Sequence, residues 1–369
     1  MSLMRFIKIG LAWMVSLFLA LPVLVVGLLV YSFSTCVRAL ASRLEPEFVN
    51  WKQLIEFDPE LGWRPIAHLD AHYMVKRDGI HRIQTDSMGW PRKDALNDEH
   101  DIVVIGDSYA FGFGIDTGSS FADLTEQPKI KAIGAPGYSM VQGVILMRQL
   151  AHQLSGKLVV WFVYPENDLY DNLFPSVFGY RSPFARNKNG SDSWEIVSDH
   201  ISPDTWVSSA RIRPNIDVLA ELCTKSPLSD RVYSACGYLI GEAVKACTSA
   251  GARLAIFAIP NLNQLESQGR KMLSSKVPNA DQFDATYPDQ RISGICDLYG
   301  VPFIAGSANL RSEDYKTWER WHWTAGGHAK VAELLRQLHD SHSSNTLSLN
   351  PSKSPIDLKS VDTEVASTY

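Results

Sequence analysis

The 369-residue chain has no run of basic residues longer than a pair, and its formal net charge is -5. Proteins that bind nucleic acid usually carry a basic patch or stripe, so this composition argues against a DNA or RNA partner. Internal repeats are also lacking, which excludes a solenoid or propeller built from short units. With 45% hydrophobic and 20% charged residues, the chain can bury a substantial core.

Cysteine is scarce, with five residues in the whole chain, and the odd number argues against a disulfide scaffold. Cys236 and Cys247 fall on one expected helix, where eleven residues separate them by roughly 16 Å, too far for a disulfide. Cys223 with Cys236 is the one pairing that the spacing favours. Cysteine usage therefore leaves the redox compartment open.

Charged residues are absent from Ile9 to Val37, a run long enough to cross a bilayer as a helix of about 20 residues. A cleaved signal peptide is the alternative, but its apolar core is usually shorter, and the small residues at 39–41 lie well past the run. A lipoprotein signal at Cys36 fits less well, because Thr35 precedes the cysteine where a very small residue is wanted. We expect an uncleaved, single-pass membrane anchor.

Basic residues flank this run equally, two on each side, so the positive-inside rule does not orient the chain. The sequence divides into an anchor (1–44), a small β-rich accessory segment (45–97), a main domain (98–340) and a serine-rich tail (341–369). We expect the tail to be disordered, because it has few large apolar residues. Residues 165–230 form an insertion that is too long for a plain loop.

Short apolar runs alternate with helical patterns through the main domain. The runs that predict buried parallel strands lie at 101–108, 129–137, 157–168, 252–261 and, more weakly, 300–306. Helical periodicity is found at 139–154, 231–251 and 327–340. Strands that alternate with helices predict an α/β domain with a parallel sheet.

Ligands of open parallel sheets bind outside the carboxyl ends of the strands. Those ends deliver three sets of residues here: Gly106, Asp107 and Ser108; Gly134 and Gly137; Glu166, Asn167 and Asp168. A later segment, "WHWTAGGH", lies between the last strand and the last helix and carries His322 and His328 to the same edge.

These residue types suit acyl transfer. A serine hydroxyl becomes a useful nucleophile when a base accepts its proton, and histidine is such a base near neutral pH. Backbone N–H groups of Ser108 and Gly137 and the Asn167 amide are possible donors to an oxyanion, each typically worth about 3 kcal/mol in the transition state.

Four blocks in order, "GDSY" (106–109), "GAPGYS" (134–139), "PEND" (165–168) and "HWTAGGH" (322–328), resemble those of SGNH (GDSL-type) hydrolases. The resemblance covers roughly residues 55–340. "FDPELGWRP" and "SMGWPR" are similar to membrane-anchored bacterial SGNH proteins linked to extracellular polysaccharide modification. The resemblance implies a three-layer α/β/α, flavodoxin-like sandwich behind an N-terminal transmembrane helix, and it places the catalytic domain on the periplasmic or extracytoplasmic side.

Carried over to this chain, the resemblance implies Ser108 as the nucleophile, His322 as the base, and Gly137 and Asn167 as oxyanion-hole donors with the Ser108 amide. Gly134 is the alternative to Gly137, but "PGY" suits the edge of the sheet better. We interpret Asp107 as structural, through acceptance of backbone N–H groups. Asn172 is expected to cap a loop.

His328 is the alternative base, but its position at the start of the last helix favours packing or a local hydrogen bond. A metal site formed by His322 and His328 lacks a third ligand and has the wrong helical spacing. No metal and no organic cofactor is indicated.

The chain departs from the family pattern at the acid. Relatives commonly have an aspartate two or three residues before the histidine, where this chain has Glu319 and Arg320. If 319–322 form a turn, Glu319 reaches the side of His322 and completes a triad; if they are extended, the site is a Ser108–His322 dyad held by a backbone carbonyl. The difference matters, since the orienting acid of serine proteases is worth about 10⁴ in kcat. We favour Glu319, with Asp314 as a distant substitute.

Aromatic residues crowd the same blocks. Trp318, Trp321 and Trp323 suit either core packing or a flat wall beside the nucleophile, where a sugar face or an acyl chain would lie. Phe111 and Phe113, which follow Ser108, are open to the same two interpretations.

We therefore expect a serine esterase that cleaves O-acyl esters through an acyl-enzyme intermediate, and we expect these esters to be carbohydrate-linked. A polysaccharide O-acyltransferase shares the first half of that reaction and is the first alternative. A lipid esterase is suggested by the anchor. A non-catalytic glycan-binding or scaffold protein of the cell envelope is the alternative of a different class, suggested by the imperfect acid.

Overall fold

The computed structural model describes residue 26 and residues 31–33, 51–75, 78–188, 193–207, 216–316 and 321–344. The predicted anchor lies almost wholly outside these ranges, as do Glu319 and residues 345–369. Within the described part of the chain, no helix is both long and apolar enough to span a membrane.

A five-stranded parallel sheet forms the centre of the domain. Its strands are β5 (Ile102–Gly106), β6 (Ile130–Gly134), β7 (Leu158–Val163), β12 (Arg253–Ala258) and β13 (Phe303–Ala305). All five apolar runs predicted as strands are thus confirmed, and every residue of β5, β6 and β7 is buried. Burial from both faces explains why these strands read as continuous apolar runs without alternation.

The strand order is β13-β12-β7-β5-β6, with all neighbours parallel. Counted in chain order from the other edge this is 2-1-3-4-5, the order of flavodoxin-type doubly wound sheets. The direction of winding reverses between β5 and β7. Crevices for ligands form at that reversal, outside the carboxyl ends of the two strands.

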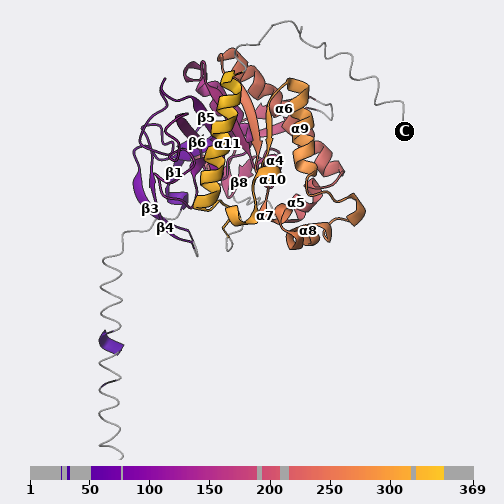
Figure 1. Cartoon of the computed structure of the whole chain (residues 1–369), viewed down its shortest axis with the longest axis horizontal. Coiled ribbons are helices and arrows are strands. Elements are labelled where there is room, and N and C mark those ends of the chain that lie inside the picture. The colour runs from indigo at the N-terminus through magenta and orange to yellow at the C-terminus, as the bar shows by residue number, and fades with distance from the viewer. Residues whose placement is uncertain are drawn as a thin grey trace, which may run out of the picture.

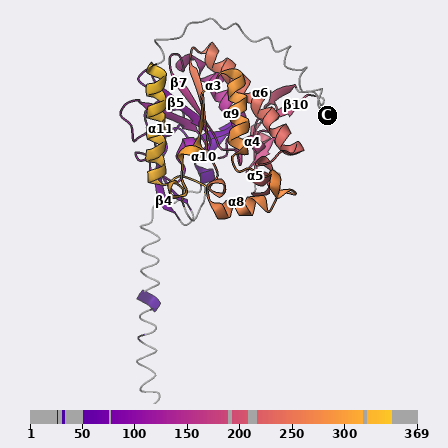
Figure 2. The same ribbon diagram turned by 45° about the vertical axis from the view of Figure 1, so that its right-hand side comes forward.

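Helices cover both faces of the sheet. On one face lie α3 (Met140–Gln149), α6 (Pro227–Ser249) and α9 (Tyr287–Tyr299), and on the other lies α11 (Ala325–Ser344), as Figures 1 and 2 show. Alternate residues of β5 feed the two cores, since Val103 and Ile105 pack on the first side and Ile102 and Val104 on the second. The three predicted helices are confirmed as α3, α6 and α11, and α11 continues to Ser344, four residues past the expected boundary at 340.

Two hairpins precede the sheet: β1 (Ile55–Asp58) with β2 (Gly62–Pro65), and β3 (Asp70–Val75) with β4 (Gly79–Gln84). A buried ion pair joins this region to the sheet, since Lys131 Nζ of β6 lies 2.8 Å from Asp86 Oδ2. Lys131 Nζ also donates to the Pro91 carbonyl at 2.9 Å, so the buried ammonium has oxygen partners on more than one side.

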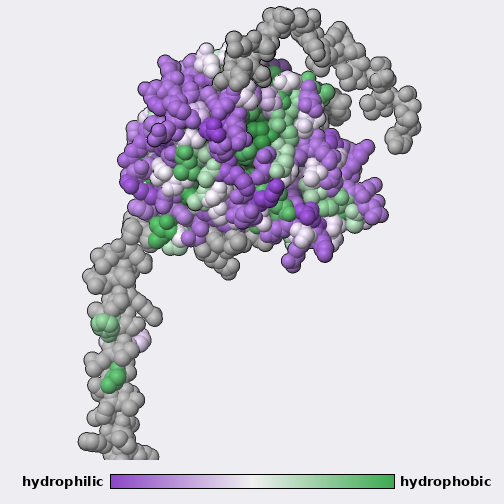
Figure 3. Space-filling model, in the orientation of Figure 1, coloured by the Kyte–Doolittle hydropathy of each residue, from purple (hydrophilic) through white to green (hydrophobic). Residues whose placement is uncertain are grey.

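The insertion after β7 contains short elements that lead back to α6. These are α4 (Asp168–Asp171), β8 (Ser176–Val177), β9 (Tyr180–Arg181), β10 (Phe184–Asn187), β11 (Trp194–Val197) and α5 (Ile216–Leu222). Four more short helices lie at the carboxyl edge of the sheet: α2 (Ser108–Phe111), α7 (Leu262–Leu265), α8 (Ser267–Ser274) and α10 (Gly306–Asn309). Hydrophilic residues cover most of the face shown in Figure 3.

The cysteines in the described ranges, Cys223, Cys236, Cys247 and Cys296, are all buried free thiols. The pairing of Cys223 with Cys236 that the spacing favoured is therefore wrong. Cys223 follows α5, whereas Cys236 is a residue of α6 whose side chain packs in the main core. Burial raises the pKa of the Cys247 thiol to about 12, so this thiol stays protonated.

Candidate active site

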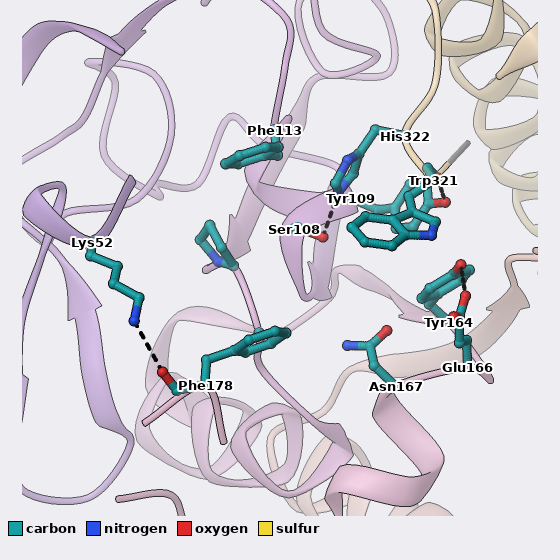
Figure 4. Close-up of a pocket in the computed structure, with 12 residues that line it drawn as sticks. Lys52, Ser108, Tyr109, Phe113, Tyr164, Glu166, Asn167, Phe178, Trp321 and His322 are labelled. Carbon is teal, nitrogen blue, oxygen red and sulfur yellow. Dashed lines mark hydrogen bonds between the residues drawn. The ribbon is translucent and has the colours of Figure 1, made fainter. Parts of the chain in front are cut away.

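A cavity of about 300 Å³ opens at the carboxyl edge of the sheet, at the reversal between β5 and β7. It is the cavity drawn in Figure 4. Its walls are Lys52, Ser108, Tyr109, Phe113, Pro136, Gly137, Tyr164, Glu166, Asn167, Phe178, Trp321 and His322. All four family-like blocks thus contribute to one cavity.

Ser108 is the first residue of α2, directly after β5. Asp107 caps this helix, because its Oδ1 accepts from the Tyr109 N–H at 2.9 Å. The structural interpretation of Asp107 is thereby confirmed, although its Oδ2 also lies 3.3 Å from Ser108 Oγ. Burial raises the pKa of Asp107, and the Tyr109 N–H bond and the nearby His322 lower it.

His322 Nε2 lies 2.8 Å from Ser108 Oγ, which is hydrogen-bonding distance. The imidazole packs between two aromatic rings, with centroids 5.2 Å from Tyr109 and 5.0 Å from Phe113 (Figure 4). The backbone carbonyl of His322 accepts a hydrogen bond from the Lys316 N–H at 2.9 Å. The ring is thus 214 residues from Ser108 in sequence and held against it by packing and by backbone hydrogen bonds.

Neighbouring backbone contacts fix the His322 segment further. Tyr315 and Trp323 form an antiparallel bridge, and the Tyr109 hydroxyl donates to the Trp321 carbonyl. Because Tyr109 follows Ser108 directly, one residue links the nucleophile's helix to the segment that carries the base.

Gly137 lines the cavity with a left-handed backbone, φ +81°. A Cβ at this position would lie 2.8 Å from Phe178 Cδ2, so both the conformation and the space call for glycine. Gly134 instead belongs to β6 and pairs with Gly106, and a Cβ there would meet the Gly106 carbonyl at 2.3 Å. Of the two glycines considered for the oxyanion hole, Gly137 is the one at the cavity.

Asn167 precedes α4 and directs its amide into the cavity (Figure 4). The Asn167 amide lowers the pKa values of the Asp107 and Asp168 carboxyls, which burial raises more strongly. Asn172 is the C-terminal cap residue of α4, and its carbonyl accepts from the Ala185 N–H at 2.6 Å.

Further carboxyl groups are buried at the cavity: Glu166 in its wall, and Asp168 and Asp171 in α4. Burial is the first cause of the raised pKa of each, and neighbouring carboxyls add to the effect at Asp168 and Asp171. Glu166 also contacts the Tyr164 hydroxyl and the Asn261 amide. This group of acids keeps protons more readily than exposed carboxyls do.

His328 has no part in this cavity. It is 2% exposed, stacks on Phe121 and accepts from the Phe121 N–H at 3.3 Å. Burial lowers its pKa to about 3, with further lowering by Lys316 and His322. The expectation that His328 packs near the start of the last helix is confirmed.

The third member of the site stays a prediction, because Glu319 lies in 317–320, outside the described residues. Asp314, the distant substitute for Glu319, has other partners. Its Oδ2 lies 2.8 Å from Lys330 Nζ and accepts from the backbone N–H of Arg311 at 2.7 Å. No cluster of three or more metal-ligating side chains is found in the part of the chain that the structure describes.

The aromatic residues divide between the two interpretations. Trp323 and Phe111 are buried in the core, whereas Phe113 and Trp321 line the cavity, and Trp321 is 53% exposed. Trp318 lies outside the described residues.

Two cavity residues carried no signal in the sequence. Lys52 comes from a short turn (Trp51–Gln53) before β1, and Phe178 from the insertion, between β8 and β9. Neither residue directly follows a strand of the central sheet in the sequence, so only the folded chain brings them to the nucleophile.

No protein-family model matches the chain, and no curated protein sequence matches it. Among solved structures it is similar to a putative acylhydrolase from Bacteroides fragilis, with TM-score 0.37 and 14% identity over 69% of this chain and 90% of that one. A GDSL-like lipase from Bacteroides thetaiotaomicron gives TM-score 0.37 and 12% identity, over 68% and 93% of the two chains. A carbohydrate acetylesterase from Sinorhizobium meliloti gives 0.36 and 11%, over 66% and 99%. Values this low establish no shared activity, so function rests on the site itself.

Proposed function

We propose that the protein is a serine esterase of the SGNH type, which cleaves O-acyl esters through an acyl-enzyme intermediate. The observation that carries the proposal is the 2.8 Å contact of His322 Nε2 with Ser108 Oγ, inside a cavity that Gly137 and Asn167 also line. A nucleophile and a base in hydrogen-bond contact are the minimum that covalent acyl transfer needs.

In the first half-reaction, Ser108 Oγ bonds to the ester carbonyl carbon while its proton passes to His322 Nε2. The carbonyl oxygen becomes an oxyanion, for which the Ser108 and Gly137 amides and the Asn167 side chain are the donors. The C–O bond to the alcohol then breaks, and the departing oxygen takes the proton from His322. The acyl group remains on Ser108.

In the second half-reaction, His322 takes a proton from an acceptor hydroxyl, whose oxygen attacks the acyl carbon and releases Ser108. Water as acceptor gives hydrolysis, and a sugar hydroxyl gives O-acyl transfer. Product analysis with an activated acyl donor, with and without an acceptor glycan, separates the esterase from the acyltransferase.

A carbohydrate-linked ester is the substrate class that we favour, because Trp321 offers a half-exposed aromatic face at the cavity wall. A lipid ester is the alternative, since Phe113 and Phe178 are also apolar walls. Rates with acetyl and long-chain acyl esters of one alcohol distinguish the two, because a cavity of about 300 Å³ favours the short acyl group.

Replacement of the nucleophile tests the proposal most directly. Ser108→Ala should abolish ester cleavage and labelling by a fluorophosphonate, with an unchanged thermal unfolding midpoint. The matched control is Ser119→Ala, a serine outside the cavity, which should keep both activities. Labelling of the Ser108→Ala variant, or ester cleavage at the original rate, would reject this site. Failure of the unmutated protein to react would favour the non-catalytic glycan-binding or scaffold alternative.

We also propose that residues 9–37 anchor the chain in a membrane, with the catalytic domain on the periplasmic or extracytoplasmic side. The uncharged length of the run supports the span, and the family resemblance supports the side. A reporter enzyme fused after residue 369 that is active only outside the cytoplasm tests the orientation.

A further inference from the structure

The β3–β4 hairpin has an apolar outer face next to the candidate active site. Met74 and Ile80 face each other across the two strands and are 54% and 46% exposed. A hydrophobic area is visible in Figure 3 at the lower left, where Figure 1 labels β4. Exposed apolar side chains that lie together are typical of surfaces that meet a partner or a membrane.

The inner face of the same hairpin is part of a small core. Tyr73 and Val75 are buried with Leu54, Ile83 and Phe111, so the outward direction of Met74 follows from the strand's alternation. Packing therefore fixes which face of the hairpin points outward, and the Met74 side chain cannot turn into the core.

Contacts tie this hairpin to the loops of the active site. The Tyr73 hydroxyl accepts from the Gly114 N–H at 2.7 Å, and the Tyr73 ring packs 5.5 Å from that of Phe113, a cavity residue. Asp78, directly before β4, pairs with the buried Lys316, whose backbone N–H donates to the His322 carbonyl. Whatever surface meets the hairpin is thus held close to the cavity.

The chain that leads from the predicted anchor enters the domain at this place. Val37 ends the uncharged run, and Leu54, seventeen residues later, packs in the hairpin's core. Seventeen residues can extend at most about 60 Å, which limits how far Leu54 can lie from the end of the run. Lys52, just before Leu54, already lines the cavity. The proposed anchor would therefore keep the hairpin and the cavity near the membrane.

The described part of the outer face carries an ion pair beside the apolar pair. Arg82, the cross-strand partner of His72, lies 2.8 Å from Asp70, so the two charges offset each other. Large apolar side chains such as Met74 and Ile80 are typical of segments that lie in the membrane interface, and the nearby anchor favours a lipid surface as the occupant.

We propose that the outer face of the β3–β4 hairpin, centred on Met74 and Ile80, contacts the surface of the bilayer and holds the catalytic cavity against substrate presented there. This inference rests on the proposed anchor. It deepens the proposed function, because it makes a membrane-presented ester, such as an acylated glycan on a lipid carrier, the substrate class.

The first test places an environment-sensitive fluorophore on the hairpin of the full-length protein in vesicles that contain anionic lipid. The label is attached at Met74→Cys or Ile80→Cys in a Cys36→Ser background; the four described cysteines are buried and should not react. The matched control is Leu298→Cys, because Leu298 is 74% exposed at the end of α9, at the opposite edge of the sheet. We expect blue-shifted emission, and quenching by brominated acyl chains, at residues 74 and 80 but not at 298. Water-like, unquenched emission at 74 and 80 would overturn the proposal.

The second test measures turnover. Met74→Asp combined with Ile80→Asp should lower severalfold the rate on an ester presented by vesicles and leave the rate on a soluble acetyl ester unchanged. Leu298→Asp should change neither rate. An equal loss on both esters would contradict the proposal, as would an unchanged rate on the vesicle ester. If the unmutated protein cleaves neither ester, the proposed esterase activity fails, and the fluorophore alone then decides whether the hairpin contacts lipid.

Discussion

Residues 321–328 divide between two environments within a short segment of the chain. Trp321 and His322 line the cavity, whereas Trp323 and His328 are buried between α11 and the sheet, with His328 in the first turn of that helix. The same two residue types thus occur once on each side. Their comparison separates what chemistry requires of this segment from what folding requires.

The two histidines differ in what surrounds the ring. His322 is 9% exposed and has the Ser108 hydroxyl as a polar partner, while His328 is 2% exposed and stacks on Phe121. Burial lowers the pKa of His328 to about 3, so at neutral pH it is a poor proton acceptor. Residue type alone therefore does not make a general base; contact with a nucleophile does.

The largest expected effect follows from breaking the cavity side of this comparison. His322→Gln keeps a polar side chain of similar size but removes the base, so kcat/KM for a soluble ester should fall by about 10⁶. The unfolding midpoint should change little, since the Tyr109 and Phe113 contacts are partly kept. Steady-state kinetics and thermal unfolding on the same preparation check both parts.

His328→Gln is the matched control for this change, because it makes the same substitution six residues away. We expect it to keep kcat/KM within about tenfold when assayed well below its unfolding temperature. Equal loss of activity in the two variants would mean that the segment acts only through its packing.

The strands could be predicted because burial from both faces leaves a strong one-dimensional signal. Each strand of the sheet appears as an uninterrupted apolar run, and each small-residue turn after β5, β6 and β7 reaches the cavity. Parallel topology brings such turns to one edge, so Ser108, Gly137 and Asn167 could be placed together from sequence order. The different roles of His322 and His328 could be predicted because His328 lies at the start of the last predicted helix.

Other features depend on contacts that leave no periodic signal. Lys52 and Phe178 reach the cavity from the accessory segment and from the insertion, by packing of irregular chain. Trp321 and Trp323 are two residues apart, and a regular strand would turn both to the same side. They separate because the chain bends at residues 321 and 322 before Trp323 bridges with Tyr315. The predicted pairing of Cys223 with Cys236 failed for a related reason. Spacing along the sequence does not show that Cys236, within α6, is buried in the hydrophobic core.

A smaller effect sharpens the core side of the comparison. His328 has a pKa of about 3 in the folded protein, against an ordinary value of 6.5. Below pH 6.5 the unfolded chain takes up a proton that the folded chain refuses, so unfolding is favoured as the pH falls towards 3. The stabilisation from neutral His328 is fully present above pH 6.5 and should be lost by about 1.4 kcal/mol per pH unit between about 5.5 and 4.

His328→Gln cannot take up this proton, so its free energy of unfolding should depend less steeply on pH than that of the unmutated protein. Urea unfolding at pH 7.0, 5.5 and 4.5 measures the difference between the two slopes. The other titratable groups are common to both proteins and cancel in the comparison. Parallel curves over this range would show that His328 is protonated in the folded state.

The smallest effect concerns the two tryptophans. Trp321 is 53% exposed, and the contact that it makes through its carbonyl with the Tyr109 hydroxyl does not need the indole. Trp321→Ala should therefore change the free energy of unfolding by less than about 0.5 kcal/mol.

If the Trp321 indole forms a wall for a sugar, loss of about 1 kcal/mol of apolar contact in Trp321→Ala should raise KM for an acylated glycan about fivefold. KM for a small acetyl ester should stay unchanged, because that substrate does not reach the indole. Trp323→Ala gives the contrast, with a loss of about 3–5 kcal/mol in stability, since this indole is fully buried among Tyr109, Phe121 and Phe162. An unchanged KM for the glycan in Trp321→Ala would remove the sugar wall from the site and favour an acyl group as the partner of this face.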